Sequence, residues 1–90
     1  MDEHVFIRPG EGERIRDQHR ILCELPHIEA VELFFPADFE GVDPHTHADH
    51  TDSFFVLEGE IEFFRAGEWH RAGAGTFVAV PPDVEHGFRP

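Results

Sequence analysis

The residues most able to do chemistry lie in the stretch HTHADHTD, residues 45–52, where three histidines and two aspartates fall within eight positions. Residues i and i+2 of a strand project from one face, about 6.5 Å apart along the chain, so His45 and His47 can turn two imidazoles toward one ion. The HxH triplet alone is weak evidence, because roughly 0.7 such triplets are expected by chance in so histidine-rich a chain. The triplet therefore needs support from elsewhere in the sequence.

That support comes from residues at regular distances further along the chain. Asp52 lies five positions after the triplet, and Gly59, where the chain can turn, lies seven further on. A second spaced set follows downstream: Gly75, Pro81 and His86. Multiplying the residue frequencies for both sets lowers the chance expectation to the order of 10⁻³. We therefore interpret these residues as a functional constellation rather than an accident of composition.

Charge and hydropathy exclude several classes of partner. The chain has seven basic and 19 acidic residues, for a net charge of −12. Nucleic-acid binding depends on lysine and arginine releasing counterions, so neither a nucleic acid nor a membrane surface is an expected partner. No stretch approaches the roughly 20 apolar residues of a spanning helix, and the N-terminus has no leader pattern. With a single cysteine that cannot form an internal disulfide, we expect a cytoplasmic protein.

The elements that would position the histidines are strands. Runs rich in phenylalanine, valine and isoleucine predict strands at 21–25, 28–35, 53–58, 60–65, 68–71 and 76–80. Proline and glycine separate these runs at intervals of about 8–12 residues without helical periodicity, which indicates an all-β sandwich or small barrel. We expect residues 1–20 to form an N-terminal extension or edge strand and residues 21–90 to form a single barrel domain.

Two of the predicted strands differ in how their apolar residues are distributed. EIEFFR, residues 60–65, alternates, with Ile61 and Phe63 on one face and glutamates on the other, so one face should meet water. IEAVELFF, residues 28–35, is apolar on both faces. A strand of that kind packs inside its own domain and against another chain, which predicts a homodimer.

The spaced residues resemble the cupin superfamily, and in particular small single-domain bacterial cupins of the conserved-barrel (cupin 2) type. The first motif of that superfamily reads approximately G-x5-HxH-x3,4-E-x6-G, and the second reads G-x5-PxG-x2-H-x3-N. Here the first is Gly41…His45-x-His47-x4-Asp52-x6-Gly59, and the second is Gly75-x5-Pro81-x-Asp83-x2-His86-x3-Pro90. The resemblance covers residues 41–90, and the run FVLEGE at 55–60 is also typical of small cupins.

Four positions depart from the family pattern. Gly41 stands closer to the first histidine, Asp83 replaces a glycine, and Pro90 falls where asparagine is usual. Asp52 replaces the usual glutamate and is one methylene shorter, which would leave its carboxylate about 1.5 Å short of an ion held by three histidines. Asp52 could then bind directly, bind through water, or accept a hydrogen bond from a ligand.

The resemblance implies a metal site. Its imidazole ligands would be His45, His47 and His86, and its carboxylate ligand would be Asp52. Mixed nitrogen and oxygen ligation suits one divalent ion of iron, manganese, nickel, copper or zinc. Asp49 and His50 lie in the loop between ligands, where we expect them to be solvated, with His50 as the substitute ligand if Asp52 does not reach.

The implied substrate pocket would hold a small organic molecule. Its predicted lining is Phe35, Phe54 and Phe88, although the same rings could simply fill the barrel. The sequence shows no nucleophile elbow or phosphate loop and assigns no catalytic residue, so any reaction would come from the metal.

The resemblance also bounds the activity. Cupins of this kind include dioxygenases, isomerases and decarboxylases, and a metal-dependent dioxygenase is the leading expectation here. The alternatives are a non-catalytic small-molecule sensor or binding module, and an interaction protein with a vestigial site. A cupin barrel normally continues past its second motif, so we also expect either a truncated sequence or a barrel that a partner's strand completes.

Overall fold

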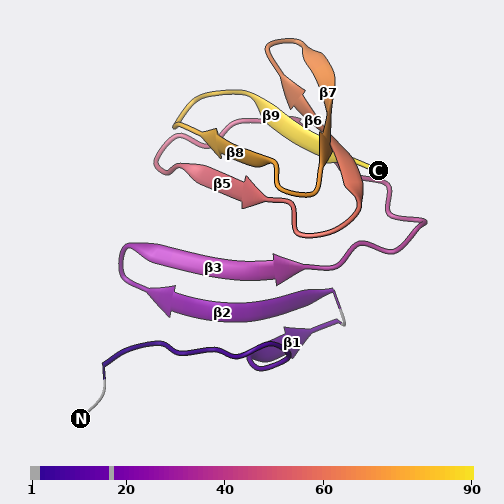
Figure 1. The fold of residues 1–90 in the computed structure, drawn as a ribbon. Helices are drawn as coiled ribbons and strands as arrows, with labels where there is room; N and C mark the ends of the chain where they lie inside the picture. The colour runs from indigo at the N-terminus through magenta and orange to yellow at the C-terminus, as the bar shows by residue number, and fades with distance from the viewer. Residues whose placement is uncertain (1–2, 17) are drawn as a thin grey trace. The chain divides into compact units, whose positions relative to one another are not determined.

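The computed structural model describes residues 3–16 and 18–90, and within these ranges the chain forms nine strands and no helix. The strands are β1 (Glu13–Ile15), β2 (His19–Leu25), β3 (Ile28–Leu33), β4 (Val42–His45), β5 (Asp52–Phe55), β6 (Glu60–Arg65), β7 (Glu68–Gly73), β8 (Phe77–Val80) and β9 (His86–Arg89). The described residues accordingly contain no helix that could cross a membrane. The predicted all-β, jelly-roll-like fold is confirmed (Figure 1).

The chain divides into two compact units, Met1–Pro36 and Ala37–Pro90. The first contains an antiparallel sheet in the order β1-β2-β3. Arg20 on β2 is 7% exposed, and its guanidinium donates to Glu32 Oε1 at 3.0 and 3.2 Å. It also donates to the backbone oxygens of Arg8 and Glu11, at 3.3 and 2.6 Å, so one buried cation ties the N-terminal segment to the sheet. The expected boundary at residues 20 and 21 stays a prediction.

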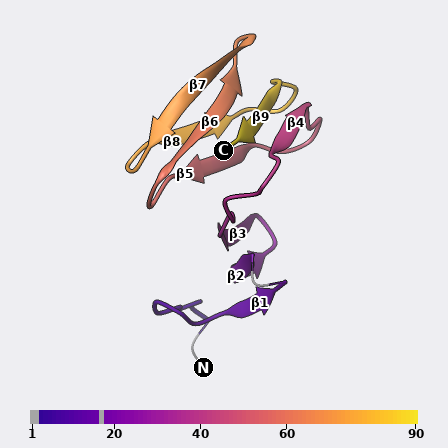
Figure 2. The same cartoon turned by 90° about the vertical axis from the view of Figure 1, so that its right-hand side faces the viewer.

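The second unit contains two antiparallel sheets, one in the order β4-β9-β6-β7 and one that pairs β5 with β8 (Figure 2). Strands β6 and β7 form a hairpin in which Arg65 pairs with Glu68. The two turn residues between them, Ala66 and Gly67, have φ values of 54° and 81°. Positive φ at both central positions gives the turn a twist that matches the strands, which explains the tight connection.

Aromatic rings from three strands form the core of this second unit. The ring centroids of Phe54, Phe63 and Phe88 lie 5.1 to 6.0 Å apart. These separations are typical of packed aromatic pairs, which stabilise a core beyond the burial of their area. Phe63, predicted on the inward face of its strand, is 4% exposed. Aromatic rings from both sheets therefore pack against one another in this core.

Strand β9 approaches β4 unusually closely. A Cβ atom added at Gly87 would lie 2.7 Å from the backbone oxygen of Val42 and 3.0 Å from the nitrogen of Pro44. Only a residue without a side chain fits such a contact. The same ladder sets His45 opposite His86. Close packing of two short strands thus brings together histidines from the two ends of the unit's sequence.

Candidate metal centre

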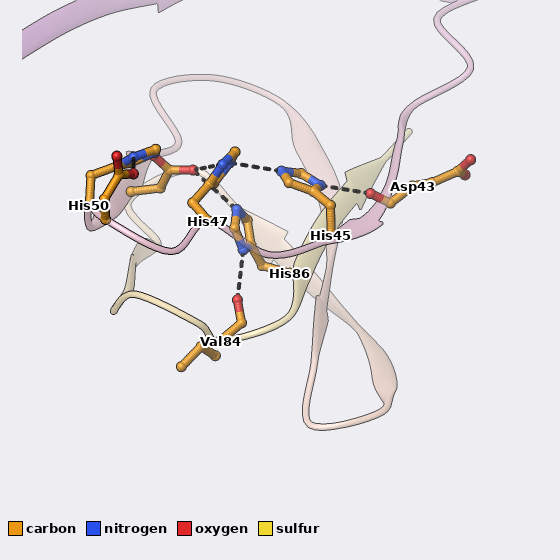
Figure 3. A network of polar contacts seen from close by, with 8 residues as sticks. Asp43, His45, His47, His50, Val84 and His86 are labelled. Carbon is orange, nitrogen blue, oxygen red and sulfur yellow. Dashed lines mark hydrogen bonds and ion pairs between the residues drawn. The ribbon is translucent and has the colours of Figure 1, made fainter.

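The four residues predicted as metal ligands come from three strand ends and one loop. His45 ends β4, His86 begins β9, and the two are register partners. His47 follows in the loop after β4, and Asp52 begins β5. Figure 3 shows the labelled side chains of His45, His47 and His86 turned toward one another. The fold therefore brings Asp52 and His86, which lie 34 positions apart in the sequence, into one cluster.

The ligand atoms of these four residues form one tight cluster. His45 Nε2 lies 3.1 Å from His47 Nε2. Asp52 Oδ2 lies 3.2 Å from His47 Nε2 and 3.1 Å from His86 Nε2. One ligand atom from each residue lies within 4.8 Å of all the others. The shorter aspartate side chain therefore reaches the histidines.

Backbone carbonyls orient two of the histidine rings. His45 Nδ1 donates to the carbonyl oxygen of Asp43 at 2.8 Å, and His86 Nδ1 donates to that of Val84 at 3.0 Å (Figure 3). A carbonyl oxygen can only accept, so each Nδ1 carries the hydrogen and each Nε2 keeps a lone pair. This outer hydrogen bond is what fixes the tautomer and direction of a metal-binding histidine.

The donor set of the cluster fits a cation. With its hydrogen on Nδ1, His86 points a lone pair at Asp52 Oδ2, which is also an acceptor, and two facing acceptors need a proton or a cation between them. Adjacent ligands of an ion with bonds of about 2.0–2.2 Å are separated by roughly 2.8–3.6 Å at octahedral or tetrahedral angles. The three separations of 3.1 to 3.2 Å lie in that range, and all four ligand atoms lie within 4.8 Å of one another.

The cluster is buried on one side and open on the other. The His86 side chain is 4% exposed, whereas those of Asp52 and His47 are 28% and 35% exposed. The Phe54 ring lies 6.4 Å from the His86 ring and belongs to the aromatic core. Burial beside aromatic rings shields His86 from water, while the side formed by His47 and Asp52 is partly exposed to solvent.

Comparison with known proteins agrees with this geometry. The family model described as "Cupin domain" matches residues 33–89. The chain belongs to the cupin family. This cupin is 30% identical over 91 residues to a protein named quercetin 2,3-dioxygenase from Bacillus subtilis (strain 168), a match that takes in 92% of the chain and 26% of that relative. The chain thus spans about a quarter of the length of that relative.

A second relative is closer in length to the cupin. The chain is 30% identical over 89 residues to an uncharacterized protein from Aquifex aeolicus (strain VF5), a match covering 99% of the chain and 69% of the relative. No solved structure matches the chain.

The loop between the proposed ligands of the cupin contains side-chain contacts that the sequence does not predict. His50 Nε2 lies 3.2 Å from Asp52 Oδ1, and His50 Nδ1 lies 3.0 Å from Asp49 Oδ1. The hydrogen bond from His50 lowers the pKa of Asp49 from its ordinary value, and the same bond raises the pKa of His50. Both side chains are exposed, in agreement with the expectation that they are solvated, but a histidine between two aspartates does not reveal in the sequence which oxygens it contacts.

The three predicted pocket residues fall in different places. Phe54 and Phe88 lie in the aromatic core of the cupin, with their ring centroids 5.7 Å apart. Phe35 belongs to the N-terminal unit, where it helps to line a surface hollow. The other residues of that hollow are Arg16, Gln18, Phe34 and Pro36. A shared pocket formed by the three phenylalanines stays a prediction.

Proposed function

We propose that this cupin binds one divalent transition metal through His45, His47, Asp52 and His86. The observation that supports the proposal is the convergence of four ligand atoms within 4.8 Å of one another. Three imidazole nitrogens and one carboxylate oxygen suit iron, manganese, nickel, copper or zinc. The backbone carbonyls that hold two of the rings add the outer support that such sites usually have.

We propose further that the loaded cupin acts on a small organic molecule as a dioxygenase. The support is the 30% identity to a protein named quercetin 2,3-dioxygenase, together with the ligand set. A redox-active ion bound at this site would supply the activation of oxygen, whose two atoms both enter the organic substrate, so no external reductant is required.

The chain's own residues would position that substrate. The aromatic core closes the inner side of His86, so a substrate would approach from the side where His47 and Asp52 are partly exposed. Phe54, whose ring centroid lies 6.4 Å from that of His86, would contact an apolar or aromatic part of a substrate that reaches this side of the cluster. These residues would thus orient the molecule and keep water from the buried face of the site.

One observation favours a second candidate, a non-catalytic binding module. The rings of Phe54, Phe63 and Phe88 pack against one another at 5.1 to 6.0 Å and so fill space beside His86. A site with a filled interior could still hold a ligand at its open side without transforming it.

Oxygen uptake separates these two functions. Protein purified without an affinity tag would be loaded in turn with Fe²⁺ and Cu²⁺ and given quercetin and other hydroxylated aromatic compounds or enediols. The dioxygenase proposal predicts substrate consumption with equimolar oxygen uptake in at least one loaded form. This activity should be lost in His86→Ala and kept in His70→Ala, because His70 lies on β7 and is not one of the four clustered residues. Ligand binding to the loaded protein without consumption would favour the binding module.

We also propose that the protein is a cytoplasmic homodimer. Ile28 and Val31, on opposite sides of the pleat of β3, are 58% and 37% exposed, as expected for a strand that packs against a second chain. Light scattering of the purified protein should give twice the mass of the chain, and a monomer at micromolar concentration would contradict the proposal.

A further inference from the structure

The two oxygens of the Asp52 carboxylate have different partners. Oδ2 faces the Nε2 atoms of His47 and His86, at 3.2 and 3.1 Å. Oδ1 instead lies 3.2 Å from Nε2 of His50. A histidine outside the four-residue cluster therefore engages the oxygen that the cluster does not use.

His50 is held in place by two further contacts. Its Nδ1 lies 3.0 Å from Asp49 Oδ1, and its ring centroid lies 4.4 Å from that of His47. The planes of the two rings are inclined by 30°, and Figure 3 labels both residues. The His50 side chain, which is 50% exposed, therefore has a neighbour at each ring nitrogen and the ring of His47 beside it.

A held histidine matters here because the carboxylate ligand is an aspartate. Its short side chain must present one particular oxygen to the centre, and rotation of the carboxylate would exchange the two. Carboxylate oxygens accept hydrogen bonds, so an N–H group on Oδ1 opposes that rotation. Orientation of a ligating carboxylate by an outer hydrogen-bond donor is a general requirement of metal sites.

We propose that His50 is a positioning residue for Asp52. By engaging Oδ1 it keeps Oδ2 turned toward the point where the other ligands converge. This inference rests on the proposed metal site and assigns His50 a role outside the ligand set. It therefore differs from the alternative in which His50 itself replaces Asp52 as a ligand.

The test measures the affinity for Co²⁺ alone, by titration against a competing chelator, in untagged protein carrying His50→Phe or His50→Gln. Phenylalanine keeps a ring but removes the donor, and we expect affinity to fall by roughly 10- to 100-fold with a shift in the Co²⁺ absorption bands. Glutamine retains an N–H group near the position of Nε2 and should restore affinity to within about threefold. His27→Phe, at an exposed histidine of the β2–β3 turn, is the matched control and should bind as the unsubstituted protein does.

A second pair of variants distinguishes positioning from ligation. If His50 acts through Asp52, then His50→Phe should cause no further loss of Co²⁺ affinity in an Asp52→Ala background. A further loss in that background would overturn the inference and make His50 a ligand. Equal affinity of His50→Phe and the unsubstituted protein, or no rescue by glutamine, would also overturn it. Failure of the unsubstituted protein itself to bind Co²⁺ would instead reject the proposed metal site, and the inference with it.

Discussion

Different interactions stabilise the two units, although both are antiparallel β structures. The N-terminal unit, Met1–Pro36, contains a buried arginine whose hydrogen bonds connect three segments. The unit Ala37–Pro90 has a core of packed aromatic rings, and the candidate metal centre lies against that core. Aromatic packing is insensitive to single hydrogen bonds, whereas a polar network depends on every partner being present. The ligand histidines are therefore carried by the unit whose packing can fix their positions.

Truncation in the aromatic core should have the largest effect. Phe63→Ala removes a ring that is 4% exposed and should lower the free energy of unfolding by about 3–5 kcal/mol. The matched variant is Phe55→Ala, whose ring on the neighbouring sheet is 59% exposed and should cost less than about 1 kcal/mol. Urea denaturation of both proteins gives the comparison. Equal losses would mean that the aromatic cluster is not the core of this unit.

Adding a methyl group at the close contact between β4 and β9 should have the next largest effect on stability. A methyl group at Gly87 would meet the Val42 oxygen at 2.7 Å, so Gly87→Ala should force the strands apart and cost about 1–3 kcal/mol. Gly73→Ala is the matched control, because an added Cβ there meets nothing within 4 Å and the unfolded chain loses entropy. Thermal unfolding should show Gly87→Ala destabilised and Gly73→Ala unchanged or slightly more stable. A neutral Gly87→Ala would contradict the close approach of the two strands.

Removing the buried cation should have a smaller effect, confined to the N-terminal unit. Arg20→Met leaves two backbone oxygens and Glu32 without their charged donor, which should destabilise the segment locally by about 1–2 kcal/mol. Amide hydrogen exchange should accelerate around Glu11 and in β2 while the amides of β9 keep their rates. Arg71→Met is the control, because Arg71 pairs with Glu60 at the surface and should contribute less than about 0.5 kcal/mol. Equal acceleration in both variants would show that Arg20 does not tie the unit together.

Sequence patterns predicted the strands that are rich in apolar residues, because those residues must be buried. The predicted runs at 60–65 and 76–80 correspond to β6 and β8, because Ile61 and Phe63 alternate with glutamates in the first and phenylalanine and valine dominate the second. The patterns did not predict β4 and β9, with sequences VDPH and HGFR. Proline, aspartate and glycine disfavour a strand by local preference, and the pairing of these two segments with each other overrides that preference.

As with the strands, the sequence predicted one part of the candidate site and not the other. Spacing and family resemblance pointed to the four clustered side chains, because metal-ligand residue types at fixed spacings can be recognised in a sequence. They could not identify the carbonyl oxygens of Asp43 and Val84 or the contact between His50 and Asp52. Every residue has a backbone carbonyl, so the sequence cannot indicate which one accepts a hydrogen bond. A side-chain contact in a loop depends on the path of the backbone. The outer contacts of the site therefore required coordinates.

X-ray absorption at the edge of the bound metal tests the central claim most directly. Untagged protein loaded with one equivalent of Zn²⁺ or Fe²⁺ should show three imidazole nitrogens and at least one oxygen at about 2.0–2.2 Å. His86→Ala should reduce the imidazole count from three to two, whereas His70→Ala should leave it unchanged. A shell made of oxygen alone, or an imidazole count that does not change in His86→Ala, would contradict the account.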